Sequence, residues 1–195
     1  DPVIQSILPK ENNGIKNFAD FDKYRITKEK HVEDPAATIT IGEARVAAPG
    51  NITPVTAEGK GGKTALAGVF IAGAISKTGY VDGFKDVSVR SNPEGKAVVH
   101  LETEQSEADQ QYNLKTALRR AGMESTPEYY HSYNIRTIAL KDYQQFTDAI
   151  CELCNETYNG IHLIVVDGAA DFITSVNDEA EANAIIFYFT TLDVK

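Results

Sequence analysis

The stretch that decides the fold is A-E-G-K-G-G-K-T at residues 57–64, which the apolar run T-A-L-A-G-V-F-I-A-G-A-I-S at 64–76 continues. Glycines let backbone N–H groups curl around a phosphate, and the N-terminus of a following helix favours an anion. Residues 51–56 have the length of a short strand. Strand, glycine-rich loop and helix in this order predict a phosphate loop, with Lys63 at the β- and γ-phosphates and the Thr64 hydroxyl on Mg²⁺.

Two residues depart from the usual form of this pattern. Ala57 stands where glycine is usual, and Pro54 lacks the N–H that a central strand would use in its ladder. The alternative is a surface turn rich in glycine and lysine. The helix predicted over 64–76 is apolar nearly all round, which is typical of a buried helix, and this context favours the phosphate loop.

A second apolar run ends in an acid. I-H-L-I-V-V-D-G at 161–168 follows the turn signal Asn159-Gly160 and is typical of a strand buried on both faces of a parallel sheet. Ligands bind at the carboxyl ends of such strands, so Asp167 is expected on the same edge as the phosphate loop. We predict that Asp167 holds Mg²⁺ through a water. The alternative is an acid that merely ends a strand.

Two glutamates follow a third run. K-A-V-V-H-L at 96–101 predicts another strand, and E-T-E-Q comes directly after it. Hydrolysis needs a carboxylate near the attacking water. Glu104 is the preferred base because it lies further beyond the strand end, nearer the phosphates. Glu102 as the base, or two exposed acids without a role, are the alternatives.

The rest of the chain alternates strands with helices. The expected elements are a short strand around Ile39 and Ile41, within 38–42; a helix capped by Ser106-x-x-Asp109 and closed by Gly122; a weaker strand over 133–140; a helix from about Asp142; and a helix from about Asp178 to Leu192. This order predicts an α/β fold, with a mostly parallel sheet and helices on both faces. Residues 1–37 are expected to form an extended or mobile arm, and 38–195 the core.

The composition is that of a globular protein, with 42% hydrophobic and 24% charged residues. The net charge of −9 gives no basic excess of the kind that a broad nucleic-acid surface shows, so a DNA contact would be local or shared by an assembly. The longest apolar stretch, 65–75, is too short to span a bilayer, and the start of the chain does not look like a signal peptide. We therefore expect a cytoplasmic protein without a membrane partner.

Cysteine and histidine give no site. Cys151 and Cys154 share an apolar helix face and have no second pair or suitably spaced histidine, so a core position is favoured over a metal or redox site. The scattered histidines are assigned no role: His31, His100, His131 and His162.

Four segments together resemble a known family. They are PGNITPVTAEGKGGKTALAGVFIAGAIS at 49–76, GKAVVHLETEQSEAD at 95–109, YNIRTIAL at 133–140 and LIVVDGAADFITSVNDEAEA at 163–182. Over about residues 38–192 the chain resembles RecA-fold P-loop ATPases of the RepA/DnaB helicase type, and it looks closest to the accessory ATPases of mobilizable transposons. The resemblance implies an ATP-hydrolysing module for DNA transactions of a mobile element or plasmid.

The resemblance also assigns residues. Those implied to bind the nucleotide are Ala57, Gly59, Lys60, Gly61, Gly62, Lys63, Thr64 and Ala65. Lys63 and Glu104 would be catalytic, with Glu104 activating water, and Thr64 and Asp167 would serve Mg²⁺. Asp171 and Asn177 match positions that recur in this subgroup, and we derive no role for them.

The resemblance implies single-stranded or duplex DNA and further copies of the chain as partners. Relatives continue past the helix at Asp178 with further strands, so the sheet is expected to be incomplete at Lys195. A non-hydrolysing nucleotide-binding regulator or assembly protein is the main alternative. A small-molecule kinase would need an arginine-rich lid, and the sequence contains none. The absence of the guanine-reading pattern N/T-K-x-D favours ATP over GTP.

Overall fold

Strand β4, Ala97–Glu102, is the centre of the fold, and all six of its residues are buried. It pairs in parallel with β5, Tyr130–Asn134, on one side and with β6, Ile161–Asp167, on the other. The computed structural model describes residues 18–58, 61–175 and 178–192. Since both faces of β4 are covered, the structure confirms an α/β fold built on a parallel sheet.

One face of this sheet is covered by α2, Lys63–Ile75, and α3, Glu107–Arg120. Val69 to Ile75 are all buried, which confirms the buried helix that the apolar sequence predicts. Burial of the large side chains among them, Val69, Phe70, Ile71 and Ile75, contributes about 1.5–3 kcal/mol each. Ser106 caps α3 as expected, because its Oγ accepts the N–H of Asp109 at 3.2 Å.

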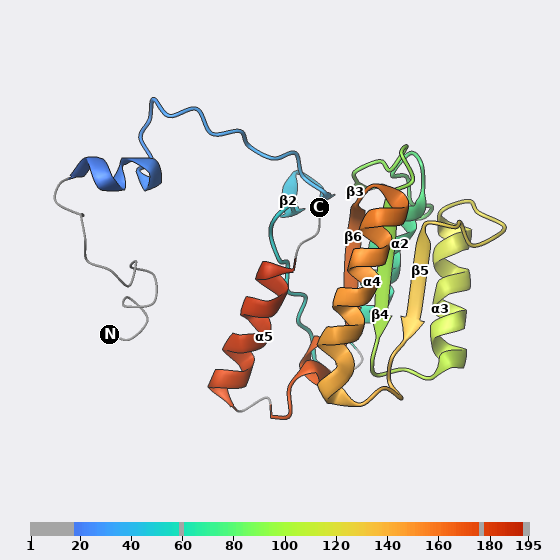
Figure 1. The fold of residues 1–195 in the computed structure, drawn as a ribbon. Helices are drawn as coiled ribbons and strands as arrows, with labels where there is room; N and C mark the ends of the chain where they lie inside the picture. Colours follow the sequence, from blue (N-terminus) through green and yellow to red (C-terminus); the bar gives the residue numbers. More distant parts are fainter. Residues whose placement is uncertain (1–17, 59–60, 176–177, 193–195) are drawn as a thin grey trace. The chain divides into compact units, whose positions relative to one another are not determined.

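The opposite face carries α4, Tyr143–Tyr158, and α5, Glu179–Thr191. Figure 1 shows α4 in front of the sheet and α2 behind it. Asn159 ends α4 in the left-handed region at φ 55°, and this is the Asn-Gly turn that the sequence predicts. Asp178 caps α5 through the N–H groups of Ala180 and Glu181, so the predicted helix starts are confirmed.

A second, separate sheet is antiparallel and has the order β2-β1-β3. Its strands are β1, Ile39–Ile41; β2, Ala44–Ala47; and β3, Val87–Val89. The strand expected around Ile39 and Ile41 is confirmed, whereas β2 and β3 were not predicted because three or four residues carry too little pattern. The parallel arrangement therefore holds for the central sheet and not for every strand.

The strand expected over 51–56, ahead of the phosphate loop, is absent, and that prediction is wrong. The backbone there is irregular. Thr53 Oγ donates to the carbonyl of Val46 at 2.9 Å, so the segment is tied to β2 and not to the central sheet. Pro54 has no N–H, which removes one ladder hydrogen bond from any strand formed here.

Two further expectations need correction. The weak strand predicted over 133–140 forms earlier, as β5, because Val98 pairs with Tyr130 at its start. After it the chain turns into a 3₁₀ helix, η2, Leu140–Asp142. Strand β6 was expected to be buried on both faces, yet only Ile161 is fully buried. It is an edge strand of the described sheet, paired with β4 alone.

The chain divides into two units, residues 1–34 and 35–195. The described part of the first unit contains a 3₁₀ helix, η1, Phe18–Tyr24. The exposed side chains of Phe18 and Tyr24 show that it has no apolar core of its own in that part. The mobile arm over residues 1–37 stays a prediction. None of the helices in the described ranges is long and apolar enough to cross a membrane.

Two glycines of α2 should respond in opposite ways to alanine. A Cβ on Gly73 would overlap the side chain of Val89 and approach Val81 at 3.1 Å, whereas a Cβ on Gly68 meets nothing within 4 Å. Gly73→Ala should lower the free energy of unfolding by about 1–3 kcal/mol, because overpacking strains the core. Gly68→Ala should raise it by about 0.5–1 kcal/mol, because glycine weakens a helix interior. Urea unfolding of both variants tests the packing of α2, and a Gly73→Ala protein as stable as the parent would contradict it.

Candidate functional site

The carboxyl ends of β4 and β6 meet at one edge of the sheet. Their register places Glu102 directly opposite Asp167. Thr103 joins the two ends, since its N–H donates to the Asp167 carbonyl at 3.2 Å and its hydroxyl donates to the carbonyls of Asp167 and Gly168 at 3.1 Å each. A Cβ at Gly168 would overlap Thr103 Oγ, so glycine is required there.

The described part of the phosphate loop leads into α2. Gly62 is the N-cap at φ 81°, and Gly61 donates to the Glu58 carbonyl at 2.9 Å. A Cβ on Gly61 would come within 2.7 Å of the Ala57 side chain, so the loop is too tight for a larger residue. Gly62 has no side chain to cap the helix, and the first N–H groups of α2 precede its hydrogen-bond ladder.

The predicted binding residues are placed as follows. Lys63 and Thr64 begin α2 and are half-buried, while Ala57, Gly61, Gly62 and Ala65 are exposed. Gly59, Lys60 and Asn177 lie outside the described residues. Asp171 is exposed in a short 3₁₀ helix, η3, Ala169–Phe172.

Gln105 links the start of α2 to the end of β4, and no sequence pattern singles it out. Its Nε2 donates to Thr64 Oγ at 3.0 Å. Its Oε1 accepts from Asn113 of α3 at 2.8 Å, and its carbonyl accepts from Asn134 of β5 at 3.0 Å. Four elements are thereby held together at the edge where Asp167 lies.

Glu102 is the acid that the fold buries. None of its surface is exposed. Its Oε1 accepts the N–H groups of Glu104 and Gln105 at 2.9 and 3.0 Å, while Oε2 is buried without a partner. Glu104, which we preferred as the base, is exposed on the loop beyond β4. The two glutamates therefore have different environments, and the alternative of two exposed acids is wrong for Glu102.

His100 lies two residues before Glu102, on the same face of β4. Its ring Nδ1 is 3.1 Å from Ser132 Oγ, and its Nε2 is buried without a partner. Asp167 Oδ2 is also buried and unpartnered. The ligand atoms of the three side chains all lie within 4.8 Å of one another. The alternation H-x-E at the end of a buried strand was the signal that could have found this cluster.

Burial dominates the electrostatics of this cluster. Loss of solvent raises the pKa of Glu102 above its usual range, the N–H groups of Gln105 and Glu104 oppose the rise, and the negative charges of Asp167 and Glu104 add to it. Loss of solvent lowers the pKa of His100 to about 4, although nearby Asp167 acts in the other direction. At neutral pH the imidazole is therefore uncharged.

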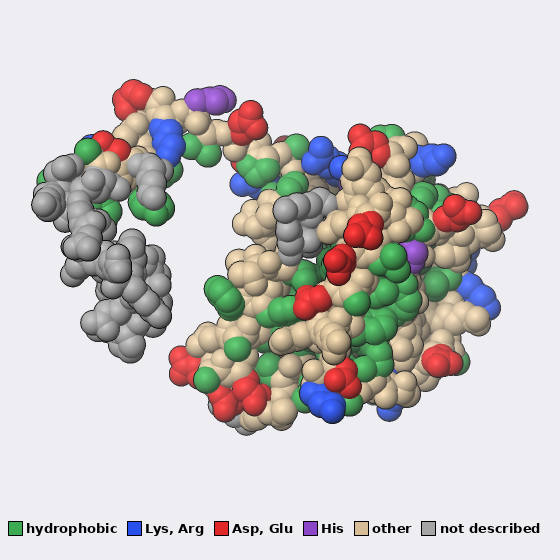
Figure 2. Space-filling model, in the orientation of Figure 1, with side chains coloured by type: hydrophobic (Ala, Val, Ile, Leu, Met, Phe, Trp, Pro, Cys, Tyr) green, Lys and Arg blue, Asp and Glu red, His purple; other side chains and the backbone are tan. Residues whose placement is uncertain are grey.

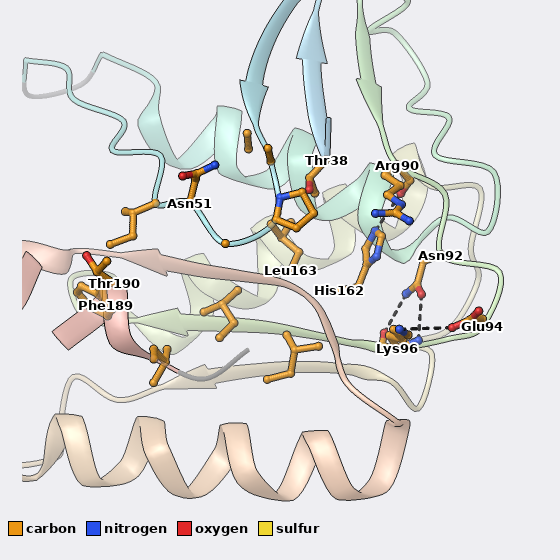
Figure 3. Close-up of a pocket in the computed structure, with 18 of the residues that line it drawn as sticks. Thr38, Asn51, Arg90, Asn92, Glu94, Lys96, His162, Leu163, Phe189 and Thr190 are labelled. Carbon is orange, nitrogen blue, oxygen red and sulfur yellow. Dashed lines mark hydrogen bonds and ion pairs between the residues drawn. The ribbon is translucent and has the colours of Figure 1, made fainter. Parts of the chain in front are cut away.

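A separate hollow lies elsewhere. It has a volume of about 880 Å³ and is lined by the first half of β6, the turn at 47–52, residues 90–96 and the end of α5. Figure 3 shows Asn51 and Arg90 on one side of it and Phe189 on another. Inside it, His162 Nε2 is 2.9 Å from the Arg90 carbonyl, and buried Asn92 holds the backbone of Lys96. It sits at the opposite end of β6 from Asp167, so it is not the predicted site.

The face drawn in Figure 2 shows no concentration of one kind of charge. On the face drawn in Figure 2, lysines and arginines are scattered among acidic and apolar side chains. Leu153 of α4 and Ile186 and Phe187 of α5 are exposed apolar residues. Comparisons with models of protein families, with curated proteins and with solved structures gave no match. We therefore take the function from the residues at the edge of the sheet.

The two cysteines should be inert in the folded protein. Cys151 and Cys154 are buried on α4, and burial raises the pKa of Cys151 to about 12, with Cys154 and Asp148 adding to the rise. Because the thiolate is the reactive form, labelling by a disulfide reagent at pH 8 should be at least about a hundredfold slower than in denaturant. Absorbance of the released thiol measures both rates. Rapid labelling of the native protein would contradict the core position of the pair.

Proposed function

We propose that this protein binds Mg-ATP at the N-terminus of α2 and hydrolyses it, as a P-loop module of the RecA type. The observation that carries the proposal is the hydrogen bond from Gln105 to Thr64. It brings the start of α2 to the loop after β4, and Thr103 ties that loop to the end of β6. In parallel sheets, this edge is where ligands bind.

The phosphates are assigned to the start of α2. The uncapped N–H groups there favour an anion, and the positive end of the helix dipole adds to the attraction. Lys63 supplies a positive charge at the first helical position. The residues proposed to surround the nucleotide are those of the phosphate loop: Ala57, Gly59, Lys60, Gly61, Gly62, Lys63, Thr64 and Ala65.

Thr64 and Asp167 fit the Mg²⁺ that accompanies the nucleotide. A hydroxyl and a carboxylate are oxygen ligands, which Mg²⁺ prefers, and this ion usually keeps several of its waters. Thr64 Oγ already accepts from Gln105, which fixes its orientation. Mg²⁺ at this place would neutralise charge on the β- and γ-phosphate oxygens.

Glu104 is the proposed base, because it is exposed next to the loop whereas Glu102 is enclosed. A base must reach the attacking water, and Glu102 has one oxygen held by two backbone N–H groups. Lys63 is the second proposed catalytic residue, since it stabilises charge on the transferred phosphoryl group.

A nucleotide-binding regulator that does not hydrolyse ATP is the second candidate. Arg119 and Arg120 lie in the last turn of α3, about 20 Å along the helix from its start beside Gln105. The Arg120 guanidinium stacks over the ring of Phe84, 4.9 Å from its centroid. Neither of these two arginines lies near the start of α2 within this copy of the chain, and we propose that a second copy supplies the cation that hydrolysis needs. The partners proposed from the resemblance are that second copy and DNA.

Lys63→Ala tests the binding half of the proposal. A charge-assisted contact contributes roughly 1.5–3 kcal/mol, so the variant should bind Mg-ATP at least about tenfold more weakly, as measured by calorimetry. Lys77→Ala, which removes an exposed lysine just beyond the other end of α2, is the matched control and should bind like the parent. Equal affinity of folded Lys63→Ala and parent proteins would refute the phosphate site.

Glu104→Gln tests the hydrolysis half of the proposal, with ATP affinity measured by calorimetry and turnover measured by release of phosphate. It should keep ATP affinity and lose turnover, because the amide keeps the shape and loses the basicity. Turnover should also rise with protein concentration if a second copy supplies the missing cation. Parent protein that binds ATP and shows no turnover at any concentration or with added DNA is the result expected of the regulator.

A further inference from the structure

Three buried polar atoms converge in the core behind the proposed nucleotide site. They are His100 Nε2, Glu102 Oε2 and Asp167 Oδ2, and none of them has a hydrogen-bond partner. Most buried polar side-chain atoms in proteins are hydrogen-bonded, and an unpaired buried acceptor costs about 1–3 kcal/mol. Three such atoms within 4.8 Å of one another therefore call for a shared partner.

The backbone, and not chance rotamers, sets this cluster. Side chains two residues apart on a strand point to the same face, so His100 and Glu102 project together from β4. The parallel register then places Asp167 of β6 opposite Glu102. Because β4 is buried along its whole length, His100 and Glu102 are enclosed, whereas Asp167 at the end of β6 is half-buried.

The remaining atoms of two of these side chains are already engaged. Glu102 Oε1 is held by the N–H groups of Glu104 and Gln105. His100 Nδ1 pairs with Ser132 Oγ, which also accepts from Gln110 Nε2 at 2.9 Å. A ligating histidine typically fixes its second ring nitrogen through such a partner, so His100 has the supporting contact of a metal ligand.

The charges favour a divalent cation. Two carboxylates and one neutral imidazole balance a charge of +2, whereas no lysine or arginine is hydrogen-bonded to this cluster among the described residues. Bonds of about 2.1 Å at tetrahedral angles set ligand atoms about 3.4 Å apart, so atoms that now lie within 4.8 Å of one another would draw together by about 1 Å on binding. An imidazole ligand suits Zn²⁺ or Mn²⁺ better than Mg²⁺, which prefers oxygen.

We propose that His100 Nε2, Glu102 Oε2 and Asp167 Oδ2 bind a divalent transition-metal ion of the Zn²⁺ or Mn²⁺ class. The ion joins β4 to β6 beneath the loop that carries Gln105. This site shares Asp167 with the Mg²⁺ proposed to accompany ATP and adds His100 and Glu102, which the nucleotide site does not use. It does not rest on the proposed function.

The test is direct titration of the chelator-treated, nucleotide-free protein with Zn²⁺ and with Mn²⁺, read by competition with a colorimetric chelator and by the melting temperature. The parent should bind one ion per chain and melt at a higher temperature in its presence. Glu102→Gln keeps the shape and removes a ligand, so its affinity should fall by more than the roughly 10–100-fold that loss of a supporting contact costs. Its melting temperature should no longer respond to the metal.

His131→Gln is the matched control, because His131 lies on the adjacent strand β5 with its own buried, unpartnered Nε2 but belongs to no such cluster. It should bind like the parent. If Glu102→Gln does not fold, Asp167→Asn replaces it in the same titration. Three results would each overturn the proposal. They are no metal binding by the parent, metal binding by Glu102→Gln as tight as by the parent, and Mg²⁺ binding by the parent as tight as its binding of Zn²⁺ and Mn²⁺. Since ATP is absent throughout, a failure to bind the metal does not bear on the proposed nucleotide site, which the Lys63→Ala variant tests separately.

Discussion

The parallel pairing of β4 with β6 is the constraint on which the rest of the structure depends. Its register puts Glu102 opposite Asp167, and Thr103 fastens the two strand ends through three hydrogen bonds. A slip of β6 by one residue would turn Asp167 from the α2 face, which it shares with Glu102, to the face of α4, which is packed with apolar side chains. Both proposed sites would be lost together, because both use the end of this strand pair.

The position of α2 follows from the same sheet. The helix is apolar nearly all round, so it can be stable only beneath the sheet and beside α3, and its N-terminus then reaches the edge where β4 and β6 end. Gln105 fixes that approach by bonding Thr64, Asn113 and Asn134 at once. A fully buried helix thus presents its one polar end to the residues that follow the strands, which is the arrangement that the proposed chemistry needs.

The sequence was sufficient to predict a helix or strand where its pattern was long and had one physical explanation. Apolar runs predicted α2, β4 and β6, and the caps at Ser106 and Asp178 are those observed. Prediction from the sequence failed where tertiary contacts determine the local structure. Residues 51–56 look like a strand, yet Thr53 bonds to β2 and Pro54 cannot complete a ladder. The site was predicted in part: Thr64 and Asp167 do share an edge, but the separation of Glu102 from Glu104 depends on how the loop turns back on Glu102. His100 was passed over because the alternation H-x-E places His100 and Glu102 on one face of β4 but does not show that Asp167 lies beside them.

Hydrogen exchange with and without Mg-ATP tests the central claim most directly, since it locates a bound nucleotide without any substitution. If the nucleotide binds where α2 begins and where β4 and β6 end, exchange should slow at residues 61–68 and 103–106 and just after Asp167. The hollow beside the first half of β6, including residues 47–52 and 90–96, should be unaffected. Protection confined to that hollow, or none anywhere at millimolar nucleotide, would contradict the account.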